Sequence, residues 1–207
     1  MITTLKTYLI ERLKQELPGK SAHAEMTPYR NVNFKETDVV IARRSGVLIL
    51  FYAKKNEPHI VLIQRPKYEG KHSGQVAFPG GKHEETDKDI IYTALREANE
   101  EVGIMMDDVE VIGQLSEVFI PVSNFVVAPV IGFINYHPKF NIDNYEVEEL
   151  IELKLEDLTT IKELSLNKII LSNNTIIKVP SFEFNNKIIW GATALMLNEL
   201  RYILLEK

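Results

Sequence analysis

Three glutamates, Glu97, Glu100 and Glu101, recur at positions i, i+3 and i+4 of a segment that we expect to be helical. Carboxylates at this spacing lie on one arc of a helix and repel one another by roughly a few tenths of a kcal/mol per pair. A divalent cation, which prefers hard oxygen ligands, would reverse that repulsion. The three residues alone leave two interpretations open, a metal-binding face or an acidic face exposed to solvent.

The helix that carries these glutamates has a signal at each end. Thr86, followed by Asp89 three residues later, predicts a start of the capping-box type, and Gly103 predicts a left-handed stop. Between them, apolar residues share one face: Ile91, Ala94, Leu95, Ala98 and Val102. That face is expected to pack on a core, which places the glutamates on the neighbouring arc.

The run from Arg96 to Ile104 resembles the signature helix of the Nudix hydrolases, Arg-Glu-aliphatic-x-Glu-Glu-x-Gly-aliphatic, and fills every fixed position of it. The upstream half differs, because Asp87 stands where the family has glutamate and lies one residue farther from the arginine, so the role of Asp87 stays open. The resemblance implies that Glu97, Glu100 and Glu101 bind Mg²⁺ or Mn²⁺, that Glu100 is also catalytic, and that Arg96 orients a glutamate by ion pairing.

A second stretch, residues 61–81, resembles the extra motif of the coenzyme A pyrophosphatase branch of that family. Arg65, Gly74 and the run Phe78-Pro79-Gly80-Gly81 match it, whereas Gly70 replaces a second arginine, for which Lys71 or His72 could compensate. Residues 121–129, 146–149 and 190–194 resemble the same branch. The resemblance implies hydrolysis of coenzyme A to 3′,5′-ADP and 4′-phosphopantetheine.

The candidate substrate-binding residues are Arg65, Lys71, Gly80 and Gly81. The two glycines permit positive φ or close approach to a ligand, although a plain turn would need the same residues. Arg65 could hold a phosphate through its fork of donors, or it could be a surface residue at the end of a strand. Glu146 is the candidate general base, and its alternative is a solvated acidic loop.

Composition excludes several function classes. The chain has no cysteine, which excludes disulfides and thiol catalysis and is compatible with a cytoplasmic location. Its net charge of −5 provides no broad basic surface, so a nucleic-acid polymer is not an expected partner. No apolar stretch approaches the length of a membrane-spanning helix, and the mixed charges near the N-terminus do not favour a membrane surface.

The elements predict an α+β fold in one domain. An N-terminal amphipathic helix reaches Leu17 and is followed by an extended connector, so that residues 1–35 pack on a Nudix domain formed by residues 36–207 or on a second copy in a homodimer. Hairpins outnumber crossovers, and the resemblance implies a Nudix-type α/β/α sandwich with a mixed sheet. The predicted strands cover residues 46–52, 59–65, 75–78, 109–119, 126–133, 150–155, 176–179 and 187–190, and later helices cover residues 156–164 and 192–205.

The favoured function is divalent-metal-dependent hydrolysis of a small nucleotide-linked pyrophosphate, with coenzyme A as the first candidate. The rival within enzymes is a Nudix hydrolase for ADP-ribose, a dinucleotide or a nucleoside triphosphate. The rivals from other classes are a non-catalytic nucleotide-sensing domain, in which loss of a glutamate is expected, and a purely structural protein. His23, His59, His83 and His137 lack ligand-like spacing and are expected at the surface.

Overall fold

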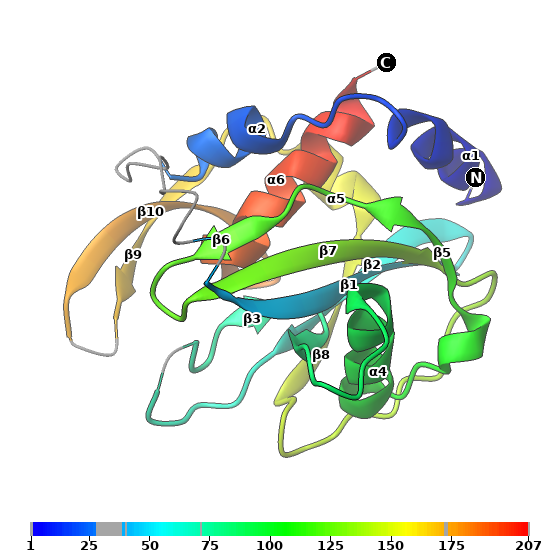
Figure 1. Cartoon of the computed structure of the whole chain (residues 1–207). Coiled ribbons are helices and arrows are strands. Elements are labelled where there is room, and N and C mark those ends of the chain that lie inside the picture. The colour runs from blue at the N-terminus through cyan, green and yellow to red at the C-terminus, as the bar shows by residue number, and fades with distance from the viewer. Residues whose placement is uncertain (1, 28–38, 40, 71, 172–173, 207) are drawn as a thin grey trace.

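A mixed sheet forms the centre of the computed structural model, which describes residues 2–27, 39, 41–70, 72–171 and 174–206 (Figure 1). Its path runs β3-β2-β1-β7-β5, while β4 pairs with β1, β6 with β7 and β8 with β2. Among the described strands of this sheet, only the pair β1 and β7 is parallel. The strands are β1 (Arg43–Lys54), β2 (Glu57–Gln64), β3 (Val76–Ala77), β4 (Gly80–Lys82), β5 (Glu110–Gln114), β6 (Val118–Ile120), β7 (Phe125–Phe133) and β8 (Glu149–Lys154).

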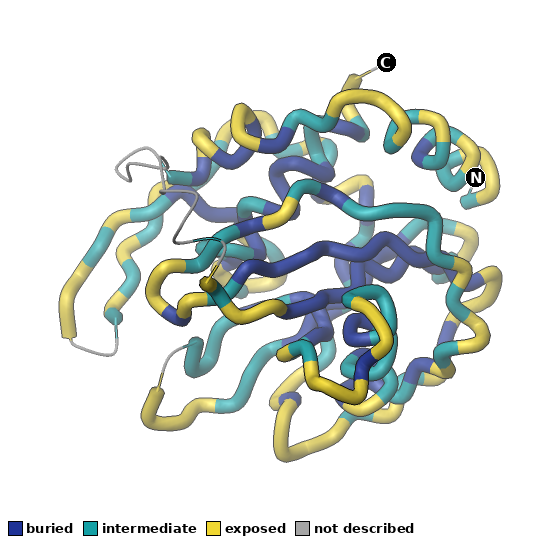
Figure 2. The backbone as a smooth tube through the Cα atoms, in the orientation of Figure 1, coloured by how far each residue is buried: buried dark blue, intermediate teal, exposed yellow. Residues whose placement is uncertain are grey.

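The central strands bury both of their faces, because side chains alternate along a strand and a helix covers each side (Figure 2). Ile49 and Phe51 belong to the core that includes Leu197 of α6 (Gly191–Leu205). Leu48 and Leu50 belong to the other core, with the apolar face of α4 (Ile90–Val102). This arrangement confirms the predicted α+β sandwich with a mixed sheet.

The described residues of the N-terminal segment contain the helices α1 (Ile2–Arg12) and α2 (Gly19–Glu25). Leu9 of α1 is fully buried in the core, as the amphipathic pattern predicts. The expectation of an extended connector is wrong for the residues of α2, which pack on α6, and the remainder of that connector from residue 28 lies outside the described residues. His23 of α2 is buried because it contacts the buried carboxylate of Glu199 at 2.9 Å, so its predicted surface position is wrong. His59 is also buried.

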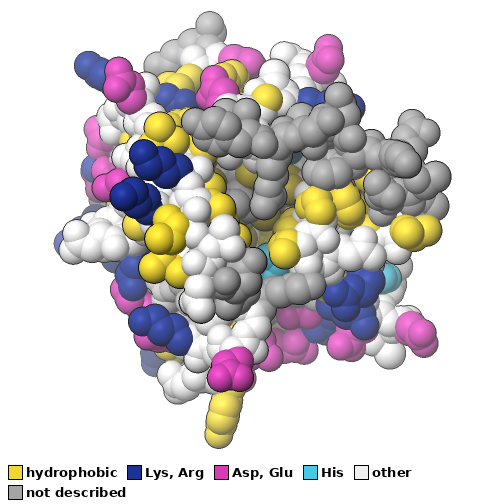
Figure 3. All heavy atoms as spheres, turned by 90° about the vertical axis from the view of Figure 1, so that its left-hand side faces the viewer, with side chains coloured by type: hydrophobic (Ala, Val, Ile, Leu, Met, Phe, Trp, Pro, Cys, Tyr) yellow, Lys and Arg dark blue, Asp and Glu magenta, His cyan; other side chains and the backbone are white. Residues whose placement is uncertain are grey.

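Beyond the central sheet, α5 (Leu155–Thr160) is shorter than predicted, a short 3₁₀ helix spans Met106–Asp108, and a three-stranded sheet contains β9 (Ser165–Ile170), β10 (Ile176–Phe184) and β11 (Lys187–Ile189). β9 was not predicted. Figure 3 shows the side of the molecule on which β9 and β10 lie. Large apolar side chains of these two strands are exposed: Leu166, Ile170 and Ile176. In the part of the chain that the structure describes, every helix is too short or too polar to span a membrane.

Candidate active site

Helix α4 begins at its N-cap Asp89, whose side chain accepts a hydrogen bond of 2.7 Å from the backbone N–H of Tyr92. The predicted start at Thr86 is therefore wrong, because the residues before the helix form a turn in which Asp87 binds the N–H of Glu84. Gly103 has φ of 73° and ends the helix in the left-handed conformation, as predicted. The two caps fix which residues of α4 face the sheet.

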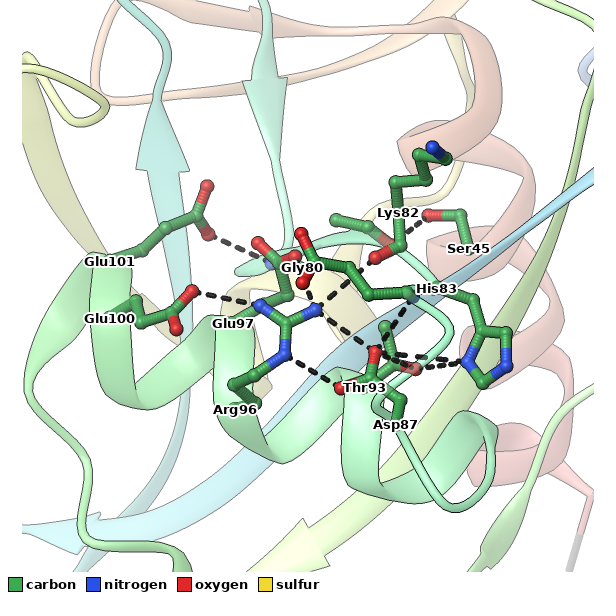
Figure 4. Close-up of polar contacts among 12 residues, drawn as sticks. Ser45, Gly80, Lys82, His83, Asp87, Thr93, Arg96, Glu97, Glu100 and Glu101 are labelled. Atoms are coloured by element: carbon green, nitrogen blue, oxygen red, sulfur yellow. Dashed lines mark hydrogen bonds and ion pairs between the residues drawn. The ribbon is translucent and has the colours of Figure 1, made fainter.

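Asp87 anchors the arginine of the signature helix. Its two carboxylate oxygens accept hydrogen bonds from Arg96 Nε at 2.8 Å and Nη2 at 3.0 Å, and its Oδ2 also accepts one from Thr93 at 2.9 Å (Figure 4). Asp87 is 6% exposed, and the Arg96 guanidinium holds the pKa of its carboxyl well below the usual range. The residue whose role the sequence left open is thus the buried partner of Arg96.

Arg96 in turn contacts two of the three glutamates. Its Nη2 lies 2.9 Å from Oε1 of Glu97, and its Nη1 lies 2.9 Å from Oε2 of Glu100. The Glu97 side chain is 14% exposed, whereas that of Glu100 is 55% exposed. Arg96 therefore fixes one carboxylate that faces inward and one at the surface.

Glu101 is the most buried of the three, with a side chain that is 1% exposed. Its Oε2 accepts a hydrogen bond of 2.8 Å from the backbone N–H of Gly80, and its Oε1 lies 3.7 Å from Nη1 of Arg65. Burial raises the pKa of Glu101 to about 8, and the nearby charges of Glu97 and Glu146 act in the same direction. Burial also raises the pKa of Glu97. Burial therefore outweighs the nearby charges of Arg96 and Arg65 at these two carboxylates.

The two glycines before the helix allow the backbone to approach α4 and β1. A Cβ on Gly81 would collide with the carboxylate of Glu97, and one on Gly80, which has φ of 154°, would collide with the backbone of Gly46. Both glycines therefore have a packing reason that does not involve a ligand. They nevertheless line the same cavity as the acidic residues.

The cavity has a volume of about 360 Å³, and Glu97, Glu101, Glu146 and Arg65 all line it. Lys82 also lines the cavity, and its side chain projects away from the Arg96 guanidinium in Figure 4. The structure thus brings together most of the predicted site residues. Glu100 and Arg96 are not among the described residues of the lining, and Lys71 lies outside the described residues.

Other residues of the lining were not singled out from the sequence as ligand-contacting. They form one wall of the cavity and come from the end of β6, the turn after it, β7 and the start of α6: Ile120, Ser123, Phe125, Val127, Ala192, Thr193 and Met196. The motif stretches 121–129 and 190–194 were the signal that could have found all of them except Ile120 and Met196, because both stretches contribute to this wall.

The donor chemistry of the cavity fits a divalent cation, because hard carboxylate oxygens line it and burial raises the pKa values of Glu97 and Glu101 despite the nearby Arg96 and Arg65. The arrangement is not a preformed cage. Among the described residues, no group of three or more His, Cys, Asp and Glu side chains stands ready to hold a metal. Glu97 and Glu100 contact Arg96, and Glu101 contacts Gly80. Glu97 and Glu101 are the carboxylates best placed to bind an ion in the cavity.

Comparison with known proteins shows the family to which the chain belongs. Residues 42–169 match the model of the NUDIX domain. A protein from Pectobacterium atrosepticum called "Uncharacterized Nudix hydrolase NudL" is 37% identical over 161 residues, which cover 76% of this chain and 81% of that protein.

Two solved structures share the fold. A Nudix hydrolase from M. smegmatis, RenU, has a TM-score of 0.54 and 15% identity over 79% of this chain and 86% of that chain. The MutT protein from Methanosarcina mazei has a TM-score of 0.51 and 18% identity over 80% of this chain and 96% of that chain. The resemblance that the signature helix suggests is confirmed, and Nudix hydrolases generally use divalent metal ions. The chain belongs to the Nudix family and is a Nudix hydrolase, an enzyme that hydrolyses the pyrophosphate of a nucleoside diphosphate-linked compound.

Proposed function

We propose that the enzyme hydrolyses the pyrophosphate bond of coenzyme A or its derivatives, in the presence of Mg²⁺ or Mn²⁺, to give 3′,5′-ADP and 4′-phosphopantetheine. The observation that carries this proposal is the position of Arg65, the arginine of the coenzyme A-type motif. It lines the cavity beside Glu101, and its buried Nε has no hydrogen-bond partner among the described residues. A guanidinium with a spare donor suits a phosphate oxygen.

The proposed roles follow from the positions of the side chains. Glu97 and Glu101, with Glu100, would hold the cation, and Glu100 also remains the catalytic candidate on α4. A divalent cation bound there supplies Lewis acidity, which neutralises charge on the pyrophosphate and acidifies water. Glu146 lines the cavity and would take the proton from the attacking water.

Two further sets of residues would position the reactants. Arg65 binds a phosphate oxygen, and Gly80 and Gly81 bring the backbone of β4 to the cavity. Arg96 keeps Glu97 and Glu100 in place, and Asp87 keeps Arg96 in place. The Asp87–Arg96 pair thus acts on the reaction through the glutamates, without contact with substrate.

The proposal is tested by measuring kcat/KM for a panel of pyrophosphates with Mg²⁺ and with Mn²⁺. The panel contains coenzyme A, ADP-ribose, diadenosine tetraphosphate and ATP. We expect coenzyme A to have the highest value. A far better value for any other compound would assign the enzyme to that substrate and contradict the proposal.

The 3′-phosphate of coenzyme A gives a sharper prediction. A charge-assisted hydrogen bond contributes about 1.5–3 kcal/mol, so coenzyme A should exceed dephospho-coenzyme A in kcat/KM by roughly 10- to 100-fold. Arg65→Ala or Lys71→Ala should narrow this ratio if that residue binds the 3′-phosphate. Equal turnover of the two compounds would leave pyrophosphate hydrolysis intact and contradict recognition of the 3′-phosphate.

Asp87→Asn tests the anchor of the signature helix. The change replaces one charged partner of Arg96 by a neutral amide, while Glu97 and Glu100 remain beside the guanidinium. The cost in unfolding free energy should therefore lie below that of breaking an isolated buried ion pair, which is about 3–5 kcal/mol. We expect a lower Tm and a lower kcat, because Glu97 and Glu100 lose their fixed position. Asp89→Asn is the matched control, since asparagine is also a good N-cap and the cost should be small.

The same pair predicts a pH dependence of stability. Because the folded pKa of Asp87 lies below its usual value of 3.8, its ionised form stabilises the fold above about pH 4, and this stabilisation is lost as pH falls through the lowered pKa. Urea unfolding from pH 6 to pH 2 should therefore show a smaller loss of stability in Asp87→Asn than in the unaltered enzyme. Equal losses in the two proteins would contradict the assignment.

A further inference from the structure

The hydroxyl of Ser123 is buried without a partner. Ser123 lies in the turn between β6 and β7, is 7% exposed, and its Oγ makes no hydrogen bond within the described part of the chain. A buried hydroxyl that lacks a partner destabilises a fold, and native proteins rarely keep one without a reason. Ser123 lines the same cavity as Glu97 and Glu101. A substrate bound in that cavity could therefore form the hydrogen bond that the Ser123 hydroxyl lacks.

The position of Ser123 is set by its backbone. Arg43 of β1 donates a hydrogen bond of 2.8 Å from Nη2 to the carbonyl of Ser123, and its backbone N–H donates one of 3.0 Å to the carbonyl of Asn124. The same guanidinium lies 4.1 Å from the ring centroid of Phe125. Because these contacts hold the turn, the hydroxyl itself is dispensable for its conformation.

The side chains around Ser123 on this wall are mostly apolar. Ile120, Phe125 and Val127 come from β6 and β7, and Ala192 and Met196 come from α6. The hydroxyl of Thr193 is already committed, since it donates a hydrogen bond of 2.9 Å to the carbonyl of Val76. Among the described residues of this wall, the side chains thus present an apolar surface together with one hydroxyl, that of Ser123, which has no hydrogen-bond partner.

We propose that this wall is the subsite for an uncharged part of the substrate, which packs an apolar face on β7 and α6 and forms a hydrogen bond with Ser123. The inference rests on the proposed function and extends it. In coenzyme A the same chemistry occurs in the pantetheine arm and in the adenine base. Helix α6 begins after residue 169, where the match to the Nudix domain ends, so part of the wall comes from outside the matched domain.

Ser123→Ala is the first test. We expect the KM for coenzyme A to rise by about 3- to 10-fold, the effect of one neutral hydrogen bond, with kcat within about twofold. The Tm of the free enzyme should stay unchanged or rise, because an unpaired buried hydroxyl is removed. A lower Tm with an unchanged KM would show a purely structural serine and overturn the inference.

Ser181→Ala is the matched control. Ser181 is fully buried on β10, outside the cavity, and its hydroxyl is paired with the Ser165 carbonyl at 3.2 Å and with Asn167 at 3.0 Å. Its replacement should lower Tm and leave KM unchanged. The two serines are thus expected to show opposite patterns of stability and binding.

Ala192→Leu tests the same subsite from α6. The larger side chain should narrow the cavity beside this wall and raise the KM for coenzyme A by about 10-fold or more. Circular dichroism and Tm check that the variant is folded. Inhibition by each product identifies the bound part. A raised Ki for 4′-phosphopantetheine in both variants indicates the pantetheine arm, and a raised Ki for 3′,5′-ADP indicates the adenine base.

Failure of the subsite can be distinguished from failure of the proposed function. If the unaltered enzyme does not hydrolyse coenzyme A, the proposed function is wrong. The variants and the unaltered enzyme are then assayed with ADP-ribose or diadenosine tetraphosphate, whichever the unaltered enzyme hydrolyses faster. An unchanged KM in both Ser123→Ala and Ala192→Leu for the compound that is hydrolysed would overturn the subsite.

Discussion

Complete removal of divalent cations with EDTA is expected to abolish turnover, and added Mg²⁺ or Mn²⁺ is expected to restore it. The reason lies in the cavity, where burial raises the pKa values of Glu97 and Glu101 even though Arg96 and Arg65 lie beside them, so their ionised forms are only partly compensated. A cation bound by hard oxygen ligands would compensate them and supply the Lewis acidity of the reaction. The measurement is the initial rate of coenzyme A hydrolysis before chelation, after chelation and after re-addition of each metal.

The control for this experiment is protein stability. The fold is held by two apolar cores and the Asp87–Arg96 pair, so circular dichroism should show a folded protein after chelation. Undiminished turnover in metal-free enzyme would contradict the proposed mechanism.

Glu101→Gln is expected to lower kcat by roughly 10²-fold or more, the scale of one lost catalytic group, without loss of stability. Because the folded pKa of Glu101 is raised to about 8, its ionised form is disfavoured in the folded state, and a neutral amide of the same size removes that penalty at pH 7. Tm should therefore stay unchanged or rise. Steady-state kinetics and thermal unfolding of the same preparation measure the two effects.

Glu199→Gln provides the opposite pattern. Glu199 is also fully buried, but it contacts His23 and the hydroxyl of Ser116 outside the cavity, and these contacts hold its pKa below the usual value despite its burial. Its replacement should lower Tm and leave kcat nearly unchanged. Near-full activity of Glu101→Gln would show that the buried carboxylate of α4 is not part of the catalytic site.

The signature helix was predictable because its information is local. Its apolar face and the stop at Gly103 depend on residues within the segment itself. Its start was predicted at Thr86, but Thr86 lies in the turn in which Asp87 binds the N–H of Glu84, and Asp89 is the cap. Asp87 and Asp89 both lie close to the start of the helix in the sequence, yet only the folded turn shows which acidic residue binds which partner.

Features that depend on distant pairs were not predictable. His23 is buried through a contact with Glu199, which lies far along the chain, and no local pattern around His23 indicates such a partner. The sequence of β9 does not alternate apolar with polar residues, since Asn167 and Lys168 are adjacent, and it is a strand because β10 pairs with it. The wall around Ser123 likewise combines β7 with α6, which meet only in the folded protein.

The central claim is tested most directly by identifying the products of coenzyme A hydrolysis. Coenzyme A is incubated with the enzyme and Mg²⁺ or Mn²⁺, and the mixture is separated by chromatography and analysed by mass spectrometry. We predict 3′,5′-ADP and 4′-phosphopantetheine in equal amounts, with neither formed by Glu101→Gln at a comparable rate. Intact coenzyme A after prolonged incubation, under conditions in which the same preparation cleaves another pyrophosphate of the panel, would contradict the claim.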